Sequence, residues 1–264
     1  METVLKKYGI RPDPELGQNF MTKNKTIKII VSLAKIKPKE KVLEIGAGMG
    51  FLTEELAKKS NDITAVEIDK KLISILRNEL RDLKNVKVVK GNILKIIKKM
   101  DFDVIVSNLP YAISEALLRK LIFCEFKRAI LVVPKGFAYR MIAKSRDRNY
   151  SKLSIFAQAF FNVKIENELS KDDFFPEPDT NSVVISMTKK PENHIQKLFI
   201  WETKKIKNSI QKALASDHKM TKKQAKEALK SLKINNNLLE KTTKNIDLKG
   251  LKTIINALIK QKKR

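Results

Sequence analysis

A polar and aromatic segment follows directly on a stretch that is apolar enough for a buried strand. The predicted strand Asp103–Ser107 leads into Asn108, Leu109, Pro110 and Tyr111. Side-chain and backbone oxygens at such a place can accept the hydrogens of an exocyclic amine, and an aromatic ring can stack on a planar base. We therefore predict that this segment holds an adenine whose amino group receives a methyl group.

The proposed chemistry depends on positioning more than on proton transfer. The exocyclic nitrogen of adenine is a poor nucleophile because its lone pair is delocalised into the ring. Two acceptors, the Asn108 side-chain oxygen and the backbone carbonyl of Leu109 or Pro110, would favour a pyramidal nitrogen that faces a methyl sulfonium. Because the sulfonium is already activated, no dedicated base is required, and the chain shows no convincing pairing of histidine with a carboxylate.

A glycine-rich turn lies between a predicted strand and a predicted helix. Gly46, Gly48 and Gly50 follow the acidic residue Glu44, and the missing side chains let the backbone turn sharply and approach a ligand. The dinucleotide fingerprint would need a third glycine at position 51, where the chain has Phe51. The turn is therefore predicted to bind a different nucleoside cofactor; a tight turn without a ligand is the structural alternative.

Two further strand ends carry residues suited to a nucleoside. Glu67 ends the second predicted strand, where a carboxylate can accept hydrogen bonds from both hydroxyls of a ribose. Asp69 lies past the strand end, and we predict that it caps the helix that begins at Lys70. Asn92 follows the third strand, where its amide can bind an adenine edge, although an amide offers only one acceptor oxygen.

Two other segments complete the set of candidate site residues. The segment that holds Gln18, Asn19 and Met21 precedes the first helix and is predicted to fold over the methionine end of the cofactor. Phe174 lies in a Pro-rich loop before the last strand, where an aromatic ring could clamp the other face of a flipped base.

Composition and charge narrow the function classes. The chain has 264 residues, 42% of them hydrophobic and 32% charged, and no apolar run approaches the length of a membrane helix. One cysteine cannot form an internal disulfide, and two histidines make a metal cluster improbable. The net charge of +26 favours a polyanionic partner, although a lysine-rich surface alone would also give such an excess. We expect a cytoplasmic protein without a metal.

The order of predicted elements indicates two domains. Between residues 41 and 189, short apolar runs alternate with helical patterns, which is typical of a parallel sheet with crossover helices; the last two strands form a hairpin. After residue 190 only helical patterns remain, over 195–214, 222–232 and 248–259. This part, residues 191–264, carries 19 Lys and Arg against six Asp and Glu. We predict an α/β domain over 1–190 and a basic helical RNA-docking domain over 191–264.

The motifs, in this order, resemble those of the small-subunit ribosomal RNA adenine N6,N6-dimethyltransferases, the KsgA/Dim family. The resemblance runs from about residue 16 to residue 187 and rests on Gly-Gln-Asn-Phe (17–20), Glu-Ile-Gly-Ala-Gly-Met-Gly (44–50), Val-Glu-Ile-Asp (66–69), Gly-Asn-Ile-Leu (91–94), Asn-Leu-Pro-Tyr (108–111) and Phe-Phe-Pro-Glu-Pro (174–178).

This resemblance implies a class I S-adenosylmethionine-dependent methyltransferase fold: a Rossmann-like, seven-stranded, mainly parallel sheet, followed by a small all-helical domain. It implies dimethylation of two adjacent adenosines in a small-subunit rRNA hairpin during ribosome assembly, by a monomer acting on the rRNA or on the pre-ribosomal subunit. The residues that it assigns to the cofactor are Gln18, Asn19, Met21, Glu44, Gly46, Gly48, Glu67, Asn92, Ile93 and Asn108. Those that it assigns to adenine are Asn108, Leu109, Pro110, Tyr111 and Phe174.

Several positions depart from the family pattern, and two other functions stay open. Asn92 stands where Asp is usual, Met21 where Leu is common, and Pro134 begins a segment that is usually Gln-Lys-Glu-Val. Leu109 replaces a proline of the Asn-Pro-Pro-Tyr motif, which argues against a DNA adenine methyltransferase. The alternatives are a large-subunit rRNA methyltransferase of the antibiotic-resistance type and an RNA-binding assembly factor with secondary methylation.

Overall fold

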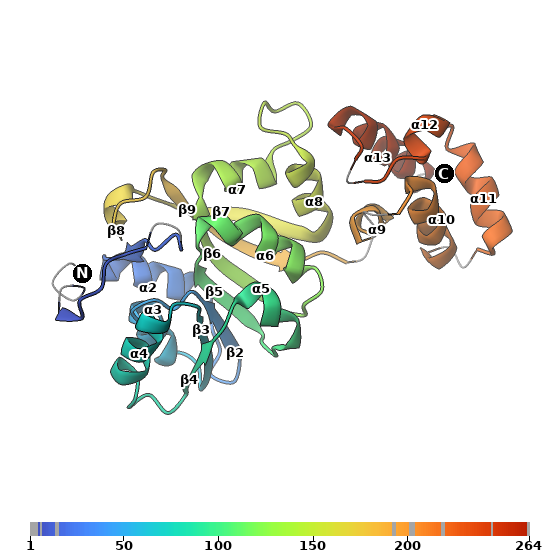
Figure 1. Cartoon of the computed structure of the whole chain (residues 1–264). Coiled ribbons are helices and arrows are strands. Elements are labelled where there is room, and N and C mark those ends of the chain that lie inside the picture. Colours follow the sequence, from blue (N-terminus) through green and yellow to red (C-terminus); the bar gives the residue numbers. More distant parts are fainter. Residues whose placement is uncertain are drawn as a thin grey trace. The chain divides into compact units, whose positions relative to one another are not determined.

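The computed structural model describes residue 5 and residues 7–13, 16–191, 194–200, 204–217, 220–243 and 245–262. These residues form two compact units (Figure 1). Unit 1 takes the described parts of Met1–Ile142 and Phe161–Lys189, and unit 2 takes those of Ala143–Phe160 and Lys190–Arg264. This division differs from the predicted boundary at residue 190 in one segment: the helix Lys152–Phe160 belongs to the helical unit, although its sequence lies between two strands of the sheet.

Unit 1 is built on a seven-stranded, mostly parallel sheet with the order β4-β3-β2-β5-β6-β9-β7. Only β9 runs antiparallel to its neighbours β6 and β7, which confirms the predicted hairpin at the end of the sheet. The strands are β2 (Lys41–Ile45), β3 (Asp62–Glu67), β4 (Val86–Lys90), β5 (Val104–Asn108), β6 (Arg128–Pro134), β7 (Phe161–Leu169) and β9 (Ser182–Lys189).

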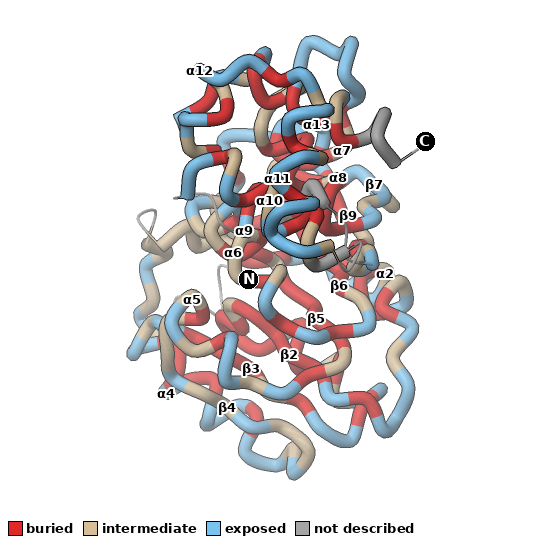
Figure 2. The backbone as a smooth tube through the Cα atoms, turned by 90° about the vertical axis from the view of Figure 1, so that its right-hand side faces the viewer, coloured by how far each residue is buried: buried red, intermediate tan, exposed pale blue. Residues whose placement is uncertain are grey.

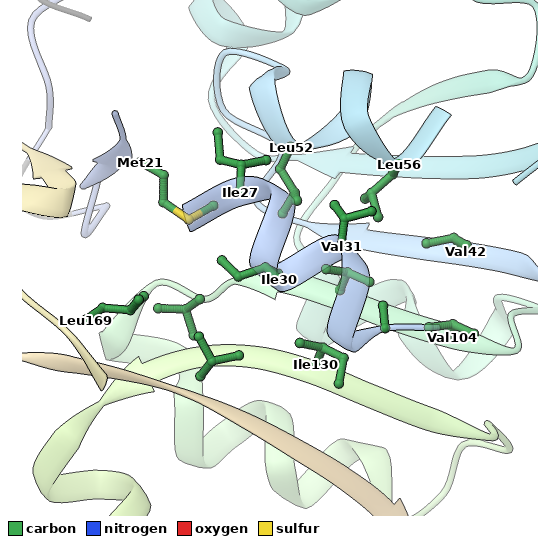
Figure 3. Close-up of a cluster of buried hydrophobic side chains, with 14 of the residues drawn as sticks. Met21, Ile27, Ile30, Val31, Val42, Leu52, Leu56, Val104, Ile130 and Leu169 are labelled. Carbon is green, nitrogen blue, oxygen red and sulfur yellow. The ribbon is translucent and has the colours of Figure 1, made fainter. Parts of the chain in front are cut away.

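Helices cover both faces of this sheet. They are α2 (Asn24–Leu33), α3 (Phe51–Ala57), α4 (Lys70–Glu79), α5 (Ile93–Ile96), α6 (Ser114–Leu121) and α7 (Lys135–Ile142), with 3-10 turns η1 (Ile97–Lys99), η2 (Tyr111–Ile113) and η3 (Lys171–Asp173). Because side chains alternate along a strand, Val104 and Val106 of β5 face α2 and α3, as Figure 3 shows for Val104. Leu131 and Ile185, on the opposite face, pack with α6 and α7.

The central strands are buried on both faces, which explains their nearly continuous apolar sequences (Figure 2). The main core cluster joins α2 and α3 to the sheet (Figure 3). Its buried members are Met21, Ile27, Ile30, Val31, Ala34, Val42, Leu52, Leu56, Ile63, Val104, Val106, Ile130, Val132, Leu169, Phe174 and Val184.

A second, two-stranded sheet was not predicted from the sequence. Strand β1 (Phe20–Met21) pairs antiparallel with β8 (Phe174–Phe175), so two segments about 150 residues apart in the chain lie side by side.

The predicted cap of α4 is confirmed, because the Asp69 side chain accepts a hydrogen bond from the Lys71 N–H.

Among the described residues of unit 2, the regular elements are helices, and one isolated β-bridge joins Lys205 to Thr242. Its helices are α8 (Lys152–Phe160), α9 (His194–Ile200), α10 (Ile206–Asp217), α11 (Lys222–Ser231), α12 (Asn236–Leu239) and α13 (Leu248–Lys262). Phe156 of α8 packs edge-on against Phe199 of α9, with ring centroids 5.4 Å apart, and this contact is part of what holds α8 in unit 2. The helix expected over 195–214 is divided into α9 and α10, where Lys205 forms an isolated β-bridge with Thr242. No helix in the described ranges has the length and apolar character needed to cross a bilayer.

Candidate active site

Unit 1 contains a cavity at the carboxyl ends of its parallel strands. Since β2, β3, β4 and β5 run in the same direction, the loops that follow them meet at one edge of the sheet. The cavity has a volume of about 160 Å³. It is lined by Leu16, Gly17, Gln18, Asn19, Phe20, Ile45, Gly46, Gly48, Val66, Glu67, Ile68, Leu72, Gly91, Asn92, Ile93, Asn108, Pro110, Ala112 and Ile113.

The predicted glycine turn forms one wall of the cavity. Gly46 and Gly48 have φ angles of 72° and 58°, a region that side chains disfavour. A Cβ atom on Gly48 would lie 3.2 Å from the Phe20 ring, so a side chain here would also displace this ring. The turn therefore requires glycine both for its backbone and for its close approach to residue 20.

Glu67 lies opposite this turn, and its carboxylate is held by the backbone. Its Oε2 accepts a hydrogen bond from the Gly48 N–H at 2.8 Å. Its Oε1 accepts from the N–H groups of Ile68 and Asp69, at 2.7 and 2.9 Å. A carboxylate oxygen has two lone pairs, so Oε2 can accept one more hydrogen bond from the cavity side. The side chain is buried but lines the cavity.

Asn92 lies at the end of β4 and caps the short helix α5. Its Oδ1 accepts a hydrogen bond from the Leu94 N–H at 3.0 Å, so the single oxygen of the amide already has one partner. No acceptor in the described part of the chain binds the Nδ2 group, which is therefore available as a donor at the cavity that Asn92 and Ile93 both line. The strand end is anchored because the Gly91 N–H donates to the Glu67 carbonyl at 2.9 Å.

Asn108 ends β5, and its amide orientation is set by the amino-terminal segment. Its Nδ2 donates to the Asn19 carbonyl at 2.7 Å. Within the described part of the chain, the structure shows no partner for Asn108 Oδ1, so this acceptor is available at the cavity. The predicted fold of residues 17–21 over the cavity agrees with Gln18 and Asn19 among its lining residues.

Two predicted residues lie in the core instead of the cavity. Phe174 and Met21 are paired across the β1–β8 ribbon, and both side chains are buried in the cluster that Figure 3 shows around Met21. The structure therefore does not place Phe174 and Met21 among the residues that line the cavity, and their roles at the base and the cofactor stay predictions. The ribbon pairing turns both side chains inward, and neither strand is visible in the local sequence pattern.

Glu44 also lies away from the cavity. It is fully buried on the face of β2 that α3 covers, and neither its Oε2 nor the Thr53 hydroxyl has a hydrogen-bond partner among the described residues. Burial raises the pKa of Glu44 to about 8; the nearby Thr53 hydroxyl opposes this shift, and the Glu67 charge adds to it. Strand alternation points the Glu44 side chain at α3 and not into the cavity, so its cofactor contact stays a prediction.

The segment after Asn108 divides between the cavity and the core. Pro110 lines the cavity, whereas the Leu109 side chain is buried against α6. Tyr111 begins η2, and its hydroxyl forms a hydrogen bond with the buried Ser182 hydroxyl. Burial raises the pKa of Tyr111, so it stays a neutral phenol near pH 7.

Several lining residues were not predicted. Ile68 is 47% exposed, an unusual position for a large apolar side chain, and it borders the cavity beside Glu67. Ala112 and Ile113 border it from η2. Ile68 could have been predicted from its position in the sequence, because it directly follows the strand-end carboxylate Glu67.

The described residues contain no group of three or more His, Cys, Asp or Glu side chains that could hold a metal ion.

Comparisons with known proteins agree with this site. The model of the family "Ribosomal RNA adenine dimethylase" matches residues 11–251. The chain belongs to this family. It is 42% identical over 191 residues to the probable ribosomal RNA small subunit methyltransferase A of Thermococcus sibiricus, covering 72% of this chain and 69% of that one. It is 40% identical over 187 residues to ribosomal RNA small subunit methyltransferase A of Thermotoga maritima, covering 71% and 67%.

A solved structure supports the same assignment. A dimethyladenosine transferase from Plasmodium falciparum superposes with a TM-score of 0.65 and 27% identity, covering 92% of this chain and 98% of that one. Membership in the family confirms the predicted resemblance and the class I methyltransferase fold. It also confirms the enzyme class, a methyltransferase that uses S-adenosylmethionine and acts on adenine in rRNA.

Proposed function

We propose that this protein methylates the N6 amines of two adjacent adenosines in a small-subunit rRNA hairpin during ribosome biogenesis, as a cytoplasmic monomer. The observation that carries the proposal is the Asn108 amide, whose nitrogen is bound by the Asn19 carbonyl and whose oxygen is available at the cavity. This orientation presents an acceptor, which an exocyclic amine requires. The relatives from Thermococcus sibiricus and Thermotoga maritima are named as small subunit methyltransferases, which supports the small subunit as the target.

Backbone hydrogen bonds favour one of the two carbonyls considered as the second acceptor. The Pro110 carbonyl already accepts a hydrogen bond from the Ile113 N–H at 3.1 Å within η2, so one of its two lone pairs is used. The Leu109 N–H donates to the Val132 carbonyl, and the next donor of the β5–β6 ladder would be residue 134. That residue is Pro134, which has no N–H. We therefore assign the second acceptor to the Leu109 carbonyl.

The cavity fits S-adenosylmethionine by the chemistry of its lining. The glycine turn at Gly46 and Gly48 leaves room for a close backbone approach, and Glu67 Oε2 offers an acceptor for a ribose hydroxyl. Ile68 and Ile93 offer apolar surface for a planar adenine, and Asn92 lies where the amino edge of this adenine would be. When bound, S-adenosylmethionine supplies a methyl group activated on a sulfonium.

The residues around Asn108 would act by orienting the target amine. Hydrogen bonds from N6 to Asn108 Oδ1 and to the Leu109 carbonyl would hold its lone pair toward the methyl group, and the Tyr111 ring would pack on the base. In each transfer the carbon–sulfur bond breaks, a nitrogen–carbon bond forms and N6 loses one proton to water. A second round on the same nitrogen gives the dimethylated base.

We further propose that unit 2 docks the RNA through a groove between α10 and α11. We define the lysine groove by its lining residues Lys204, Asn208, Gln211, Lys212, Ala215, Lys222, Ala225 and Lys226. They repeat at helical spacing on each helix, so four lysines border one concave surface whose lining includes no carboxylate. Much of α11 is exposed, as Figure 2 shows. A phosphodiester backbone is the partner that such a charge distribution suits.

Positive charges lie close together inside the lysine groove. Lys204 lowers the pKa of Lys212, because the two ammonium groups are near each other. Two lysines outside the groove, Lys205 and Lys207, form ion pairs with Glu240. The charge of the groove is therefore concentrated, which favours binding of a polyanion.

The direct test uses two RNA substrates side by side. The protein is incubated with labelled S-adenosylmethionine and either small ribosomal subunits that lack the modification or large-subunit RNA, and the digested nucleosides are analysed by mass spectrometry. Dimethyladenosine in the small-subunit RNA alone is the expected result. Label in the large-subunit RNA would contradict the proposed target, and binding of S-adenosylmethionine without label in either RNA would contradict the proposed reaction.

A further inference from the structure

Gln18 connects the amino-terminal segment to the entrance of α4 through both ends of its amide. Its Oε1 accepts a hydrogen bond from the Asp13 N–H at 2.9 Å, and its Nε2 donates to Asp69 Oδ2 at 2.8 Å. Its own N–H donates to the Asp13 carbonyl at 3.2 Å. Every polar group of this side chain except one N–H and one lone pair is thus used in its bonds to Asp13 and Asp69.

Asp69 is a rigid anchor for this contact. Its second oxygen, Oδ1, accepts from the Lys71 N–H at 2.8 Å and caps α4. Its backbone N–H donates to Glu67 Oε1 at 2.9 Å. The Asp69 side chain therefore has one oxygen committed to the helix and one to Gln18, and it cannot rotate without losing one of the two.

The residue after Gln18 supplies the carbonyl that orients Asn108. Because the peptide bond between residues 18 and 19 is planar, a shift of Gln18 would also shift Asn19 and its carbonyl. That carbonyl accepts from Asn108 Nδ2 at 2.7 Å. If it moved away, the Asn108 amide could turn its Nδ2 toward the target amine, and two donors would then face each other.

We propose that Gln18 is a positioning residue for the methyl transfer: through Asp69 it holds the Asn19 carbonyl where it selects the productive orientation of the Asn108 amide. This inference rests on the proposed function, because it assigns the orientation of an acceptor for N6. Gly17 supports the same geometry from the other side. Its φ is 64°, and a Cβ atom there would lie 3.6 Å from the Pro110 side chain.

The test exchanges the amide of Gln18 and the carboxylate of Asp69 between the two positions. Gln18→Glu places two carboxylates against each other, and Asp69→Asn leaves one oxygen for two donors, so each single variant loses the contact. The double variant Gln18→Glu/Asp69→Asn restores it, because the new amide can cap α4 with its oxygen and donate its N–H to the new carboxylate.

We expect kcat to fall about tenfold or more in each single variant and to return to within about threefold of the wild type in the double variant. The affinity for S-adenosylmethionine and the melting temperature are measured for all variants, since a merely structural role would lower stability without recovery of kcat. Gln224→Glu, the same change at an exposed residue of unit 2, is the matched control and should leave kcat unchanged.

Additive losses in the double variant, or single variants with the kcat of the wild type, would overturn the assignment of Gln18. Failure of the proposed function has a different outcome, since the wild-type protein would then methylate no small-subunit RNA and Asn108→Ala would have no activity to remove.

Discussion

The carboxyl edge of the sheet in unit 1 and the lysine groove of unit 2 differ in how their polar side chains are held. At the sheet edge, Glu67 accepts three backbone hydrogen bonds and Asn108 is oriented by a backbone carbonyl. In the groove, four exposed lysines border one concave surface and concentrate positive charge there. The difference indicates that the chemistry depends on exact orientation of few groups, whereas docking of a polyanion depends on the number of charges.

The sharpest test of this contrast removes one oriented group. Asn108→Ala deletes the acceptor at the cavity, and we expect kcat for methyl transfer to fall about 100-fold or more, because an oriented acceptor contributes that much in comparable sites. The measurement is single-turnover methylation of small-subunit RNA, with S-adenosylmethionine binding followed in parallel by calorimetry. Asn162→Ala, an exposed asparagine of β7, is the control and should retain the wild-type rate. An active Asn108→Ala variant would contradict the role of orientation.

A second test concerns the buried carboxyl group beside the site. Between pH 4.5 and about 8, Glu44 is neutral in the folded protein and ionised in the unfolded chain, so the folded state binds more protons. Stability should therefore fall as the pH rises through this window and level off above it. Glu44→Gln should remove this loss, which is of the order of 2–4 kcal/mol.

Urea unfolding at pH 5 and pH 8.5 measures this effect as the difference between variant and wild type. Glu240→Gln is the matched control: this exposed carboxyl pairs with Lys205 and Lys207, which lower its pKa, so it is ionised throughout the window. An identical pH slope for Glu44→Gln and the wild type would show that the buried carboxyl does not titrate as assigned.

The groove test removes charge without removing any oriented group. Four Lys→Gln substitutions at residues 204, 212, 222 and 226 should flatten the plot of log K for RNA against log salt by about 3, and weaken binding about tenfold or more near physiological salt. The same substitutions at Lys223, Lys230, Lys241 and Lys249 remove equal charge from exposed positions outside the groove. Equal changes in both variants would mean that net charge, and not the groove, determines docking.

The smallest expected effect concerns the affinity of the sheet edge for S-adenosylmethionine. Asn92→Asp would keep the cap on α5 and add a second acceptor oxygen for the adenine amino group. We expect S-adenosylmethionine to bind a few-fold tighter, by about 0.5–1 kcal/mol, because one additional hydrogen bond is formed. Isothermal titration calorimetry measures the change, and Asn92→Ala, which loses both the cap and the amide, provides the opposite limit. Weaker binding by the Asp variant would contradict an amino group at this position.

Residues that act through their own strand or helix could be predicted well. The strand-end position of Glu67 and the helix cap at Asp69 follow from local alternation and helix-start rules, and both are present. The cavity also contains the glycine turn and Asn108, because parallel strands must bring their carboxyl ends to one edge. These features need only the identity and order of the elements.

Side chains whose direction depends on distant partners could not be predicted. Phe174 turns into the core because β8 pairs with β1, and the helix at Lys152–Phe160 joins unit 2 because its phenylalanine packs on α9. Both depend on contacts between segments far apart in the chain, and neither contact leaves a periodic pattern in the local sequence.

The sequence by itself determined the motifs, the order of the strands along the chain, the family and the concentration of positive charge after residue 190. These features depend on residue type and spacing. Only the tertiary structure decided that Glu44 is buried against α3, that the Pro110 carbonyl accepts a hydrogen bond from Ile113, and that the side chains of Gln18 and Asn108 donate to Asp69 and to the Asn19 carbonyl. Each of these depends on which hydrogen-bond partners meet in space, and the folded backbone alone determines that.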